Sequence, residues 1–331
     1  MSNVTIQDIA EAAGVSKSTV SRVLNGTASV NPAKHDAVME ATRRLGFRPN
    51  VLARSLASGK SLTIGVLTQL IGSPFYDTIA QGVIARLGGT RYSPIFVDGQ
   101  LQRDQQLDGV RALIGRQVDG MLLIGGDVTD NEITDLCGQI PVAVVARQLE
   151  NSRHYCVWTD NMDGGYQATR HLVERGHRRI AIIRGLDHHF DTKDRYTGYC
   201  KALSEAEIPF DADLVLEGDF SGESGSACVE KLIQQGTKFS AVFAMNDMMA
   251  FGARLALSRH NISVPEQVSI IGFDDQMESA FMPPPLTTVR QPAREMGRSA
   301  AAAVLAMIDG EDVESLRVQA ELVERESVVC V

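Results

Sequence analysis

The sequence lacks any long apolar run, and this absence argues against a membrane protein. A membrane-spanning helix needs about 18 consecutive apolar residues, whereas the longest candidate run here, residues 300–308, has about half that length. The N-terminus also lacks the apolar region of an export signal. We therefore expect a cytoplasmic protein with no membrane partner.

Cysteine is scarce, and its spacing argues against two kinds of site. The chain has five cysteines, at positions 137, 156, 200, 228 and 330, and none of them forms a CxxC pair. This odd-numbered, scattered set fits a reducing compartment and argues against disulfides or a zinc site. The motifs GxGxxG, GxSxG and HExxH are absent as well. We therefore predict no enzyme activity, no catalytic residue, no metal and no cofactor.

Residues 4–26 predict two short helices joined by a tight turn. Thr5 and Asp8 form an approximate capping box for the first helix. Gly14 ends that helix with a residue that tolerates the left-handed conformation, and Ser16 caps the second helix. The polar side chains left on the outside of the second helix are Lys17, Ser18, Ser21, Arg22 and Asn25.

These outer side chains have the length and chemistry to hydrogen-bond base edges and phosphates in a DNA major groove. The alternative is a small helical hairpin with a solvated surface, because any soluble helix is polar on its outside. Asn31 followed by Pro32 favours a third helix that completes a small domain, with Gly46 as its stop. Charge also favours DNA binding. Residues 1–60 carry eight Lys or Arg and four Asp or Glu, a net +4, and the whole chain carries −9, which leaves −13 for residues 61–331.

The residues after the third helix predict a short connecting helix. Residues 48–50 form a break, and Asn50 can cap a helix over residues 51–58 that Gly59 would stop. A helix this short is only marginally stable by itself. A plain linker is the alternative.

From Leu62 onwards, short apolar strands alternate with amphipathic helices. Strands of near-continuous Val, Ile and Leu are typical of parallel sheets covered on both faces by helices. They fall into two series, which predicts an α/β body with two similar lobes. The expected strands are residues 63–68, 93–98, 120–124, 142–146 and 156–160 in the first series, and 179–184, 214–219, 241–244 and 268–273 in the second. We expect residues 283–292 to cross back to the first lobe, a helix over 292–309, and a return of 321–331 to the second lobe.

Ligands of such sheets bind outside the carboxyl ends of the strands, so two facing lobes define a cleft. Aromatic, Arg, Asn and Asp side chains near these ends suit a sugar, which stacks on a ring and forms paired hydrogen bonds through its hydroxyls. The candidate ligand-binding residues are Ser73, Phe75, Arg147, Asp191, Arg195, Phe220, Asn246 and Asp274.

Several positions near the expected cleft have a structural alternative. Phe75 can belong to the core, and Arg195 can form an ion pair between the lobes. We expect Asp247 to cap the following helix, and Asp275 can either hold a turn or contact the ligand. The neighbouring His188 and His189 are expected to form a lip of the cleft and not a metal site.

The runs VTIQDIAEAAGVSKSTVSRVLNG at 4–26, RPN at 48–50 and LARSLASGKSLTIGV at 52–66 resemble the lactose-repressor/galactose-repressor family of bacterial transcription regulators. The resemblance extends over essentially all 331 residues. It implies a body like that of periplasmic sugar-binding proteins. It also implies a hinge helix that orders when two copies meet over the operator, with Leu56 as a wedge in the minor groove.

The resemblance also implies roles in the cleft. Arg195 stands in RYTGY, which matches the family's arginine-x-x-glycine-aromatic pattern, and the family's effector contacts fall on Arg195, Asn246 and Asp274. Phe220 is implied as the stacking platform. Many family members have a polar residue before the arginine that matches Arg147, and Ala146 stands there in this chain. The identity of the effector therefore stays open at this point.

Three segments make up the predicted organisation. Residues 1–47 form the helix-turn-helix domain, 48–60 the hinge, and 61–331 the effector-binding and dimerisation body. Within the body, lobe one comprises about 61–160 and 291–320, and lobe two about 161–290 and 321–331. The DNA-binding candidates are Thr5, Ser16, Lys17, Ser18, Ser21, Arg22, Asn25, Asn31 and Leu56.

We expect a sequence-specific DNA-binding repressor whose operator affinity depends on a sugar or glycoside bound between the lobes. One helix-turn-helix reads one half-site, so we also predict a homodimer on a pseudo-palindromic, double-stranded operator. The alternatives are a regulator controlled by a protein corepressor and a sugar-binding transport component, which the missing export signal opposes.

Overall fold

The computed structural model describes residues 4–25, 30–47, 59–149, 154–187 and 189–331. It divides into two compact units, Met1–Ser61 and Leu62–Val331. The break predicted at 48–50 and the hinge helix predicted over 51–58, with Leu56, lie outside the described residues.

The first unit contains three short helices, α1 (Ile6–Ala13), α2 (Lys17–Asn25) and α3 (Pro32–Arg44). The capping box predicted for α1 is confirmed, because the Thr5 hydroxyl accepts from the Asp8 N–H and the Asp8 carboxylate accepts from the Thr5 N–H at 2.7 Å. Gly14 follows α1 with a left-handed φ of 63°, as predicted. Buried side chains of all three helices, Ile9, Val20 and Val38, form the core of this head.

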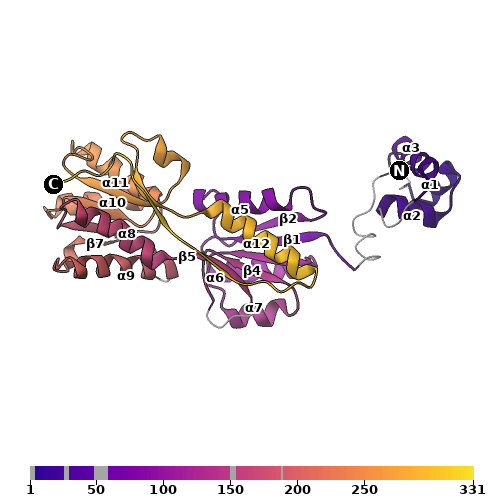
Figure 1. The fold of residues 1–331 in the computed structure, drawn as a ribbon, viewed down its shortest axis with the longest axis horizontal. Coiled ribbons are helices and arrows are strands. Elements are labelled where there is room, and N and C mark those ends of the chain that lie inside the picture. Colours follow the sequence, from indigo (N-terminus) through magenta and orange to yellow (C-terminus); the bar gives the residue numbers. More distant parts are fainter. Residues whose placement is uncertain (1–3, 26–29, 48–58, 150–153, 188) are drawn as a thin grey trace. The chain divides into compact units, whose positions relative to one another are not determined.

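The second unit contains two six-stranded sheets (Figure 1). In the first sheet the order is β11-β5-β4-β3-β1-β2, and in the second it is β12-β10-β9-β8-β6-β7. All pairings are parallel except that of β10 with β12. The strands are β1 (Thr63–Thr68), β2 (Ser93–Asp98), β3 (Gly120–Ile124), β4 (Val142–Val145), β5 (Tyr155–Thr159), β6 (Ile180–Arg184), β7 (Val215–Glu217), β8 (Ala241–Ala244), β9 (Ser269–Asp274), β10 (Thr287–Arg290), β11 (Leu316–Val318) and β12 (Glu321–Val323).

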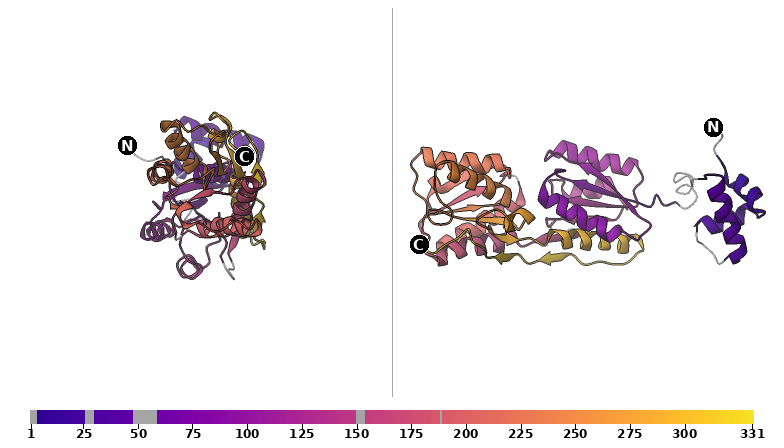
Figure 2. Two further views of the ribbon diagram at one scale, coloured as in Figure 1. Left: turned by 90° about the vertical axis from the view of Figure 1, so that its left-hand side faces the viewer. Right: turned by 90° about the horizontal axis from the view of Figure 1, so that it is seen from above.

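Helices cover both faces of each sheet, which is why the central strands are apolar throughout (Figures 1 and 2). In the first lobe, α5 and α12 pack together over one face, and α6 and α7 pack on the other. In the second lobe, α8 pairs with α9 and α10 pairs with α11 around a single core. The helices are α5 (Pro74–Leu87), α6 (Arg103–Gly115), α7 (Asp130–Cys137), α8 (Asn161–Glu174), α9 (Phe190–Glu205), α10 (Gly222–Gln234), α11 (Asp247–Arg259) and α12 (Ala293–Ile308), with short 3-10 turns η1 (Ala212–Leu214) and η2 (Met277–Ala280).

The chain passes between the lobes three times. It leaves the first sheet after β5, returns after β10, and leaves again between β11 and β12, which lie in different sheets. Figure 2 shows this last, yellow segment running from one lobe to the other.

One predicted crossing is wrong in detail. Residues 283–292 were expected only to connect the lobes, but Thr287–Arg290 is strand β10, which pairs with β9 in the second sheet. The strand has only four residues between proline-containing segments, so it gives little apolar pattern. The return to the first lobe begins after it.

Candidate functional site

The helix α2 exposes polar side chains on one side and buries apolar ones on the other. Val20 has no exposed surface, whereas Lys17, Ser18 and Arg22 are exposed and Ser21 is half-buried. The exposed group offers two cations and a hydroxyl, which can contact phosphates and base edges in a major groove.

Three other predicted DNA contacts lie at helix starts. Thr5 caps α1, the Ser16 hydroxyl accepts from the backbone N–H three residues on at 3.2 Å, and the Asn31 amide oxygen accepts from the N–H two residues on at 2.9 Å. All three are exposed, at helix ends whose N–H groups and dipole favour phosphate. The side chain of Asn25 and all of Leu56 lie outside the described part of the chain.

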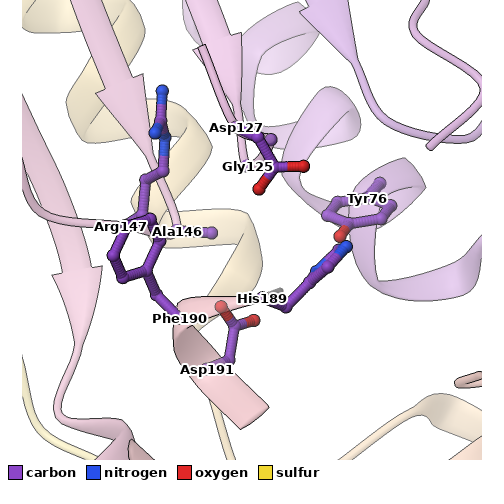
Figure 3. Close-up of a pocket in the computed structure, with 9 residues that line it drawn as sticks. Tyr76, Gly125, Asp127, Ala146, Arg147, His189, Phe190 and Asp191 are labelled. Carbon is purple, nitrogen blue, oxygen red and sulfur yellow. The ribbon is translucent and has the colours of Figure 1, made fainter. Parts of the chain in front are cut away.

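A pocket lies where the two lobes face each other (Figure 3). The first lobe contributes residues that follow β1, β3 and β4, and the second lobe contributes the start of α9, so the pocket forms at the carboxyl edges of the sheets, as expected for parallel sheets. Its volume is about 10 Å³, which is the space that one buried water needs. It is lined by Tyr76, Gly125, Gly126, Asp127, Ala146, Arg147, His189, Phe190 and Asp191.

Arg147 is the cation of the first-lobe wall. Its side chain is only 6% exposed, and its Nη2 donates to the carbonyl of Val128. Its Nε is buried without a hydrogen-bond partner in the described structure. Burial lowers the pKa of the guanidinium. A buried donor that lacks an acceptor is costly, so a ligand oxygen at this position would be stabilised.

The turn after β3 brings the backbone close to two buried glutamines. Gly125 and Gly126 have φ values of 64° and 83°, and a Cβ at Gly126 would lie 2.4 Å from the Gln69 Nε2 and 2.6 Å from the Gln106 Oε1. Gln106 accepts from the Asp127 N–H at 2.9 Å. The Gln69 Oε1 and the Gln106 Nε2 are buried without partners in the described structure. The glycines therefore allow a polar layer directly beneath the pocket.

Arg195 does not line the pocket, but it lies next to Asp191, a lining residue of the second lobe. Its Nε donates to Asn161 Oδ1 at 2.8 Å, its Nη1 donates to the carbonyl of Met245, and its Nη2 lies 3.8 Å from the Asp191 carboxylate. Its guanidinium carbon lies 3.8 Å from the ring centroid of Phe273. This set of partners makes Arg195 the rigid centre of the second-lobe site.

Asp274 ends β9 next to this arginine. It is 8% exposed and accepts from Gln291 Nε2 at 2.7 Å. Burial is the main cause that raises the pKa of Asp274 to about 6; the charge of Asp191 acts in the same direction, and Arg195 and the side chains of Gln291 and Gln276 act against it. The carboxylates of Asp191 and Asp274 are therefore both close enough to the buried Arg195 to interact with its positive charge.

Asn246 and Phe220 pack together beside the start of α11. The Asn246 Nδ2 donates to the carbonyl of Phe220 at 2.9 Å, and its Oδ1 accepts from the Met249 N–H at 2.9 Å. Asn246 therefore caps α11. The cap was expected at Asp247, and that expectation is wrong, because Asp247 is the first helical residue and is fully buried. The Phe220 ring lies 5.5 Å from the ring of His189, between centroids, so it supports the pocket from behind a lining residue.

Two predicted residues of the first lobe, Ser73 and Phe75, do not line the pocket. Ser73 is the residue before α5 and forms no side-chain cap, and the half-buried Phe75 packs against Tyr76 with the rings tilted by 59° and their centroids 5.5 Å apart. Tyr76 itself lines the pocket. Burial raises its pKa, and so do the charges of nearby carboxylates.

Two of the eight predicted ligand residues, Arg147 and Asp191, line the pocket directly. Arg195 lies 3.8 Å from Asp191, and the Phe220 ring packs against His189, so these two residues support lining residues without lining the pocket themselves. Sequence reasoning did not select Asp127 and Phe190. The signal for Asp127 was present, because it follows two glycines at the carboxyl end of β3. Phe190 is the first residue of α9, and no strand pattern points to it.

The described residues lack two features. They contain no group of three or more His, Cys, Asp or Glu placed to hold a metal ion. Among the same residues, no helix has both the length and the apolar character needed to span a membrane.

Two family descriptions match the chain. Residues 5–50 match the bacterial regulatory proteins of the lacI family, and residues 169–328 match a periplasmic binding protein-like domain. Catabolite control protein A of Priestia megaterium is 34% identical over 96% of both chains. The HTH-type transcriptional repressor PurR of Vibrio atlanticus (strain LGP32) is 34% identical over 98% of both chains.

Solved structures show the same likeness. A lac repressor dimer bound to operator and the anti-inducer ONPF aligns with a TM-score of 0.90 and 27% identity over 99% of this chain and 100% of that one. A complex of the transcriptional regulator CelR with cellobiose aligns with a TM-score of 0.72 and 32% identity, over 98% of this chain and 99% of that one. The head, the two-lobed body and the near-complete coverage agree, and the chain belongs to the lacI family of bacterial regulatory proteins.

Proposed function

We propose that this protein is a transcriptional repressor that binds operator DNA through its head under the control of a small molecule held between its lobes. One observation carries the proposal: a single chain joins a helix-turn-helix, whose α2 exposes Lys17, Ser18 and Arg22, to a body with a polar pocket between two lobes. Either part alone would support binding of DNA or of a ligand, but not control of one by the other.

On the DNA side, we propose that α2 enters the major groove and that helix starts contact phosphates. Each head reads one half-site, so we propose a homodimer on a pseudo-palindromic operator. Residues 48–60 are proposed as the hinge between the head, residues 1–47, and the body, residues 61–331, with Leu56 as the side chain that enters the minor groove. The proposed DNA contacts are Thr5, Ser16, Lys17, Ser18, Ser21, Arg22, Asn25, Asn31 and Leu56.

On the ligand side, we propose a sugar or glycoside as the effector. A related regulator was solved with cellobiose, and the cleft of this chain supplies aromatic, arginine and carboxylate side chains, which suit sugar hydroxyls. A pocket of about 10 Å³ is too small for a hexose, so binding requires the lobes to separate or side chains to move. The proposed effector contacts are Ser73, Phe75, Arg147, Asp191, Arg195, Phe220, Asn246 and Asp274.

The two functions must be coupled through a difference in affinity. An effector changes operator binding only if it binds one lobe arrangement more tightly than another and the DNA-bound dimer prefers one of the two. We propose a binding role and no catalysis for the pocket, and a cytoplasmic location, because the relatives named above are transcription regulators.

Selection from a random pool of DNA duplexes, followed by gel shifts with and without a panel of sugars, tests this function. We expect enrichment of a pseudo-palindromic sequence and a ligand-dependent change in its affinity. Enrichment without any response to small molecules would favour a regulator controlled by a protein corepressor. No enrichment, together with sugar binding, would favour a binding component of another system and would overturn the proposal.

A further inference from the structure

Carboxylates outnumber cations around the pocket. The lining contains Asp127 from the first lobe and Asp191 from the second, with Arg147 as its only Lys or Arg among the described residues. Figure 3 shows the two carboxylates reaching into the space between the lobes from opposite sides. Directly behind the lining, Arg195 and Asp274 add one charge of each sign, so the excess of negative charge remains.

The cations near the pocket are already engaged. The Nε and Nη1 of Arg195 donate to oxygens of Asn161 and Met245, and its Nη2 lies 3.8 Å from the Asp191 carboxylate. Its positive charge is therefore already partly neutralised by the protein. Arg147 donates through Nη2 to a backbone carbonyl. The pKa of the Tyr76 hydroxyl reflects the same balance. Burial is the largest cause of its increase. The charges of Asp191, Asp274 and Asp127 raise this pKa as well, and the charge of Arg195 lowers it.

The same wall also contains donors that lack an acceptor. Within the described part of the chain, the Arg147 Nε in the lining is buried with no hydrogen-bond partner, and so are the Gln106 Nε2 and the Gln69 Oε1 next to Gly126, behind the lining. A carboxylate accepts hydrogen bonds only, and these nitrogens donate only, so a complementary ligand group must do both. A hydroxyl does both. A phosphate or carboxylate oxygen cannot donate to Asp127 and Asp191, and an ammonium cannot accept from Arg147.

We propose that the effector is an uncharged polyhydroxylated molecule, a neutral sugar or glycoside, and that Asp127 and Asp191 exclude sugar phosphates and sugar acids from this pocket. The inference rests on the proposed function and narrows its ligand class. An anionic ligand would place its charge beside two carboxylates at low local dielectric, where the repulsion is large. A neutral sugar instead donates its hydroxyl protons to both carboxylates and accepts from the Arg147 Nε.

The test compares matched ligands on the full chain by isothermal titration calorimetry. The panel pairs neutral monosaccharides and disaccharides, cellobiose among them, with their aldonic acids and 6-phosphates. We expect a neutral member to bind about tenfold or more tightly than its anionic counterparts, because a hydrogen bond to a charged group is lost and repulsion is added. Equal or tighter binding of an anionic member, or no binding by any neutral member, overturns the proposal.

Charge-matched variants locate the cause. Asp191→Asn is expected to reduce the ratio between neutral and anionic affinities by about fivefold or more, since it removes one repelling charge. Asp187→Asn removes an exposed carboxylate that pairs with Arg184 and does not line the pocket, so the ratio should stay unchanged. An unchanged ratio in Asp191→Asn would overturn the assigned role of the carboxylates.

Gel shifts on the same preparations separate this inference from the proposed function. An anionic panel member that changes operator affinity would leave the function intact and end the inference. A neutral member that binds the pocket while operator affinity stays the same would leave the inference intact and count against the function.

Discussion

At the scale of single residues, the cleft depends on backbone conformations that L-amino acids rarely adopt. Ala146, Phe220 and Asp274 have φ values of 64°, 70° and 112°. Each costs about 1–3 kcal/mol and persists only where surrounding contacts fix it. All three lie at or just after the carboxyl ends of strands, where they turn the chain and direct the neighbouring side chains toward the cleft.

Arg195→Lys tests the rigid centre of the second-lobe wall. Lysine keeps the charge but loses the planar fork that reaches Asn161, the Met245 carbonyl and Asp191 together. We expect affinity for the tightest-binding sugar of the panel to fall about tenfold or more, with operator binding in the absence of sugar retained. Calorimetry and gel shifts measure the two quantities. Arg259→Lys, at the exposed end of α11, is the control, and equal sugar affinity in both variants would contradict the role of Arg195.

Asp247→Asn tests a buried acid below the cleft. Asp247 is fully buried and accepts from Ser279, Thr288 and the Gln276 N–H. Burial and then the charge of Asp274 raise its pKa from 3.8 to about 7. The folded chain therefore holds this proton more tightly than the unfolded chain, and the contribution of Asp247 to stability falls as the pH rises from about 4 to about 7.

Asparagine has nearly the same shape and does not ionise. We expect the unfolding free energy of the variant, relative to wild type, to rise by about 1 kcal/mol per pH unit across that window. Urea unfolding followed by the fluorescence of Trp158, the single tryptophan, measures it. The unfolding free energy of the surface variant Asp187→Asn should change with pH in the same way as that of wild type. If the unfolding free energies of Asp247→Asn and wild type also changed with pH in parallel, Asp247 would not titrate between about pH 4 and pH 7.

At the scale of elements, glycines set the distance between paired helices. A Cβ at Gly252 on α11 would lie 1.8 Å from a backbone oxygen of α10, and one at Gly297 on α12 would lie 2.0 Å from a backbone oxygen of α5. A Cβ at Gly165 on α8 would lie 2.3 Å from the carbonyl oxygen of Arg195 on α9. Because Gly165 lets the α9 backbone at Arg195 lie close to α8, the packing of these two helices sets the position of the Arg195 side chain in the site.

Gly252→Ala should destabilise the body by about 1–3 kcal/mol or more, because the added methyl group meets backbone and cannot be relieved by a rotamer change. Gly115→Ala is the matched control. It lies at the exposed end of α6 with nothing within 4 Å of the added Cβ, so it should stabilise by about 0.5–1 kcal/mol. Urea denaturation of both variants measures these changes. Similar effects of the same sign would contradict the packing explanation.

Helix α2 provides a test of DNA reading. Arg22 is exposed on α2, and its loss should weaken operator binding by about 1–3 kcal/mol and reduce discrimination between operator and unrelated DNA. Arg43→Ala removes the same charge from α3, where the arginine pairs with Glu40, and should leave discrimination unchanged. Fluorescence anisotropy on both kinds of duplex measures the ratio. A similar loss of discrimination in both variants would indicate a general charge effect.

The sequence predicted the elements better than the contacts between them. Strands β1, β2, β3 and β8 and the caps of α1 and α3 have the expected bounds, because continuous apolar runs and capping residues are local signals. Strands β10, β11 and β12 were not predicted, since each has three or four residues and depends on pairing with distant strands. The pocket lining was predicted in part, because which side chains meet depends on how the start of α9 faces the first lobe.

At the scale of the whole molecule, charge divides the chain. Residues 1–60 carry +4 and residues 61–331 carry −13. Net charge therefore favours attraction of the DNA phosphates to residues 1–60 over residues 61–331. In the proposed function, control of DNA affinity has to come from the lobe arrangement, since the pocket lies in the body and the proposed DNA contacts lie in residues 1–60.

The most direct measurement is an anisotropy titration of the full chain on a labelled duplex that carries the selected pseudo-palindrome, with and without the tightest-binding neutral glycoside. We expect strong preference for this duplex over a shuffled one, and a ligand-dependent change in affinity of about tenfold or more. Equal affinity for both duplexes, or no change with a glycoside that calorimetry shows to be bound, would contradict a repressor controlled from its cleft.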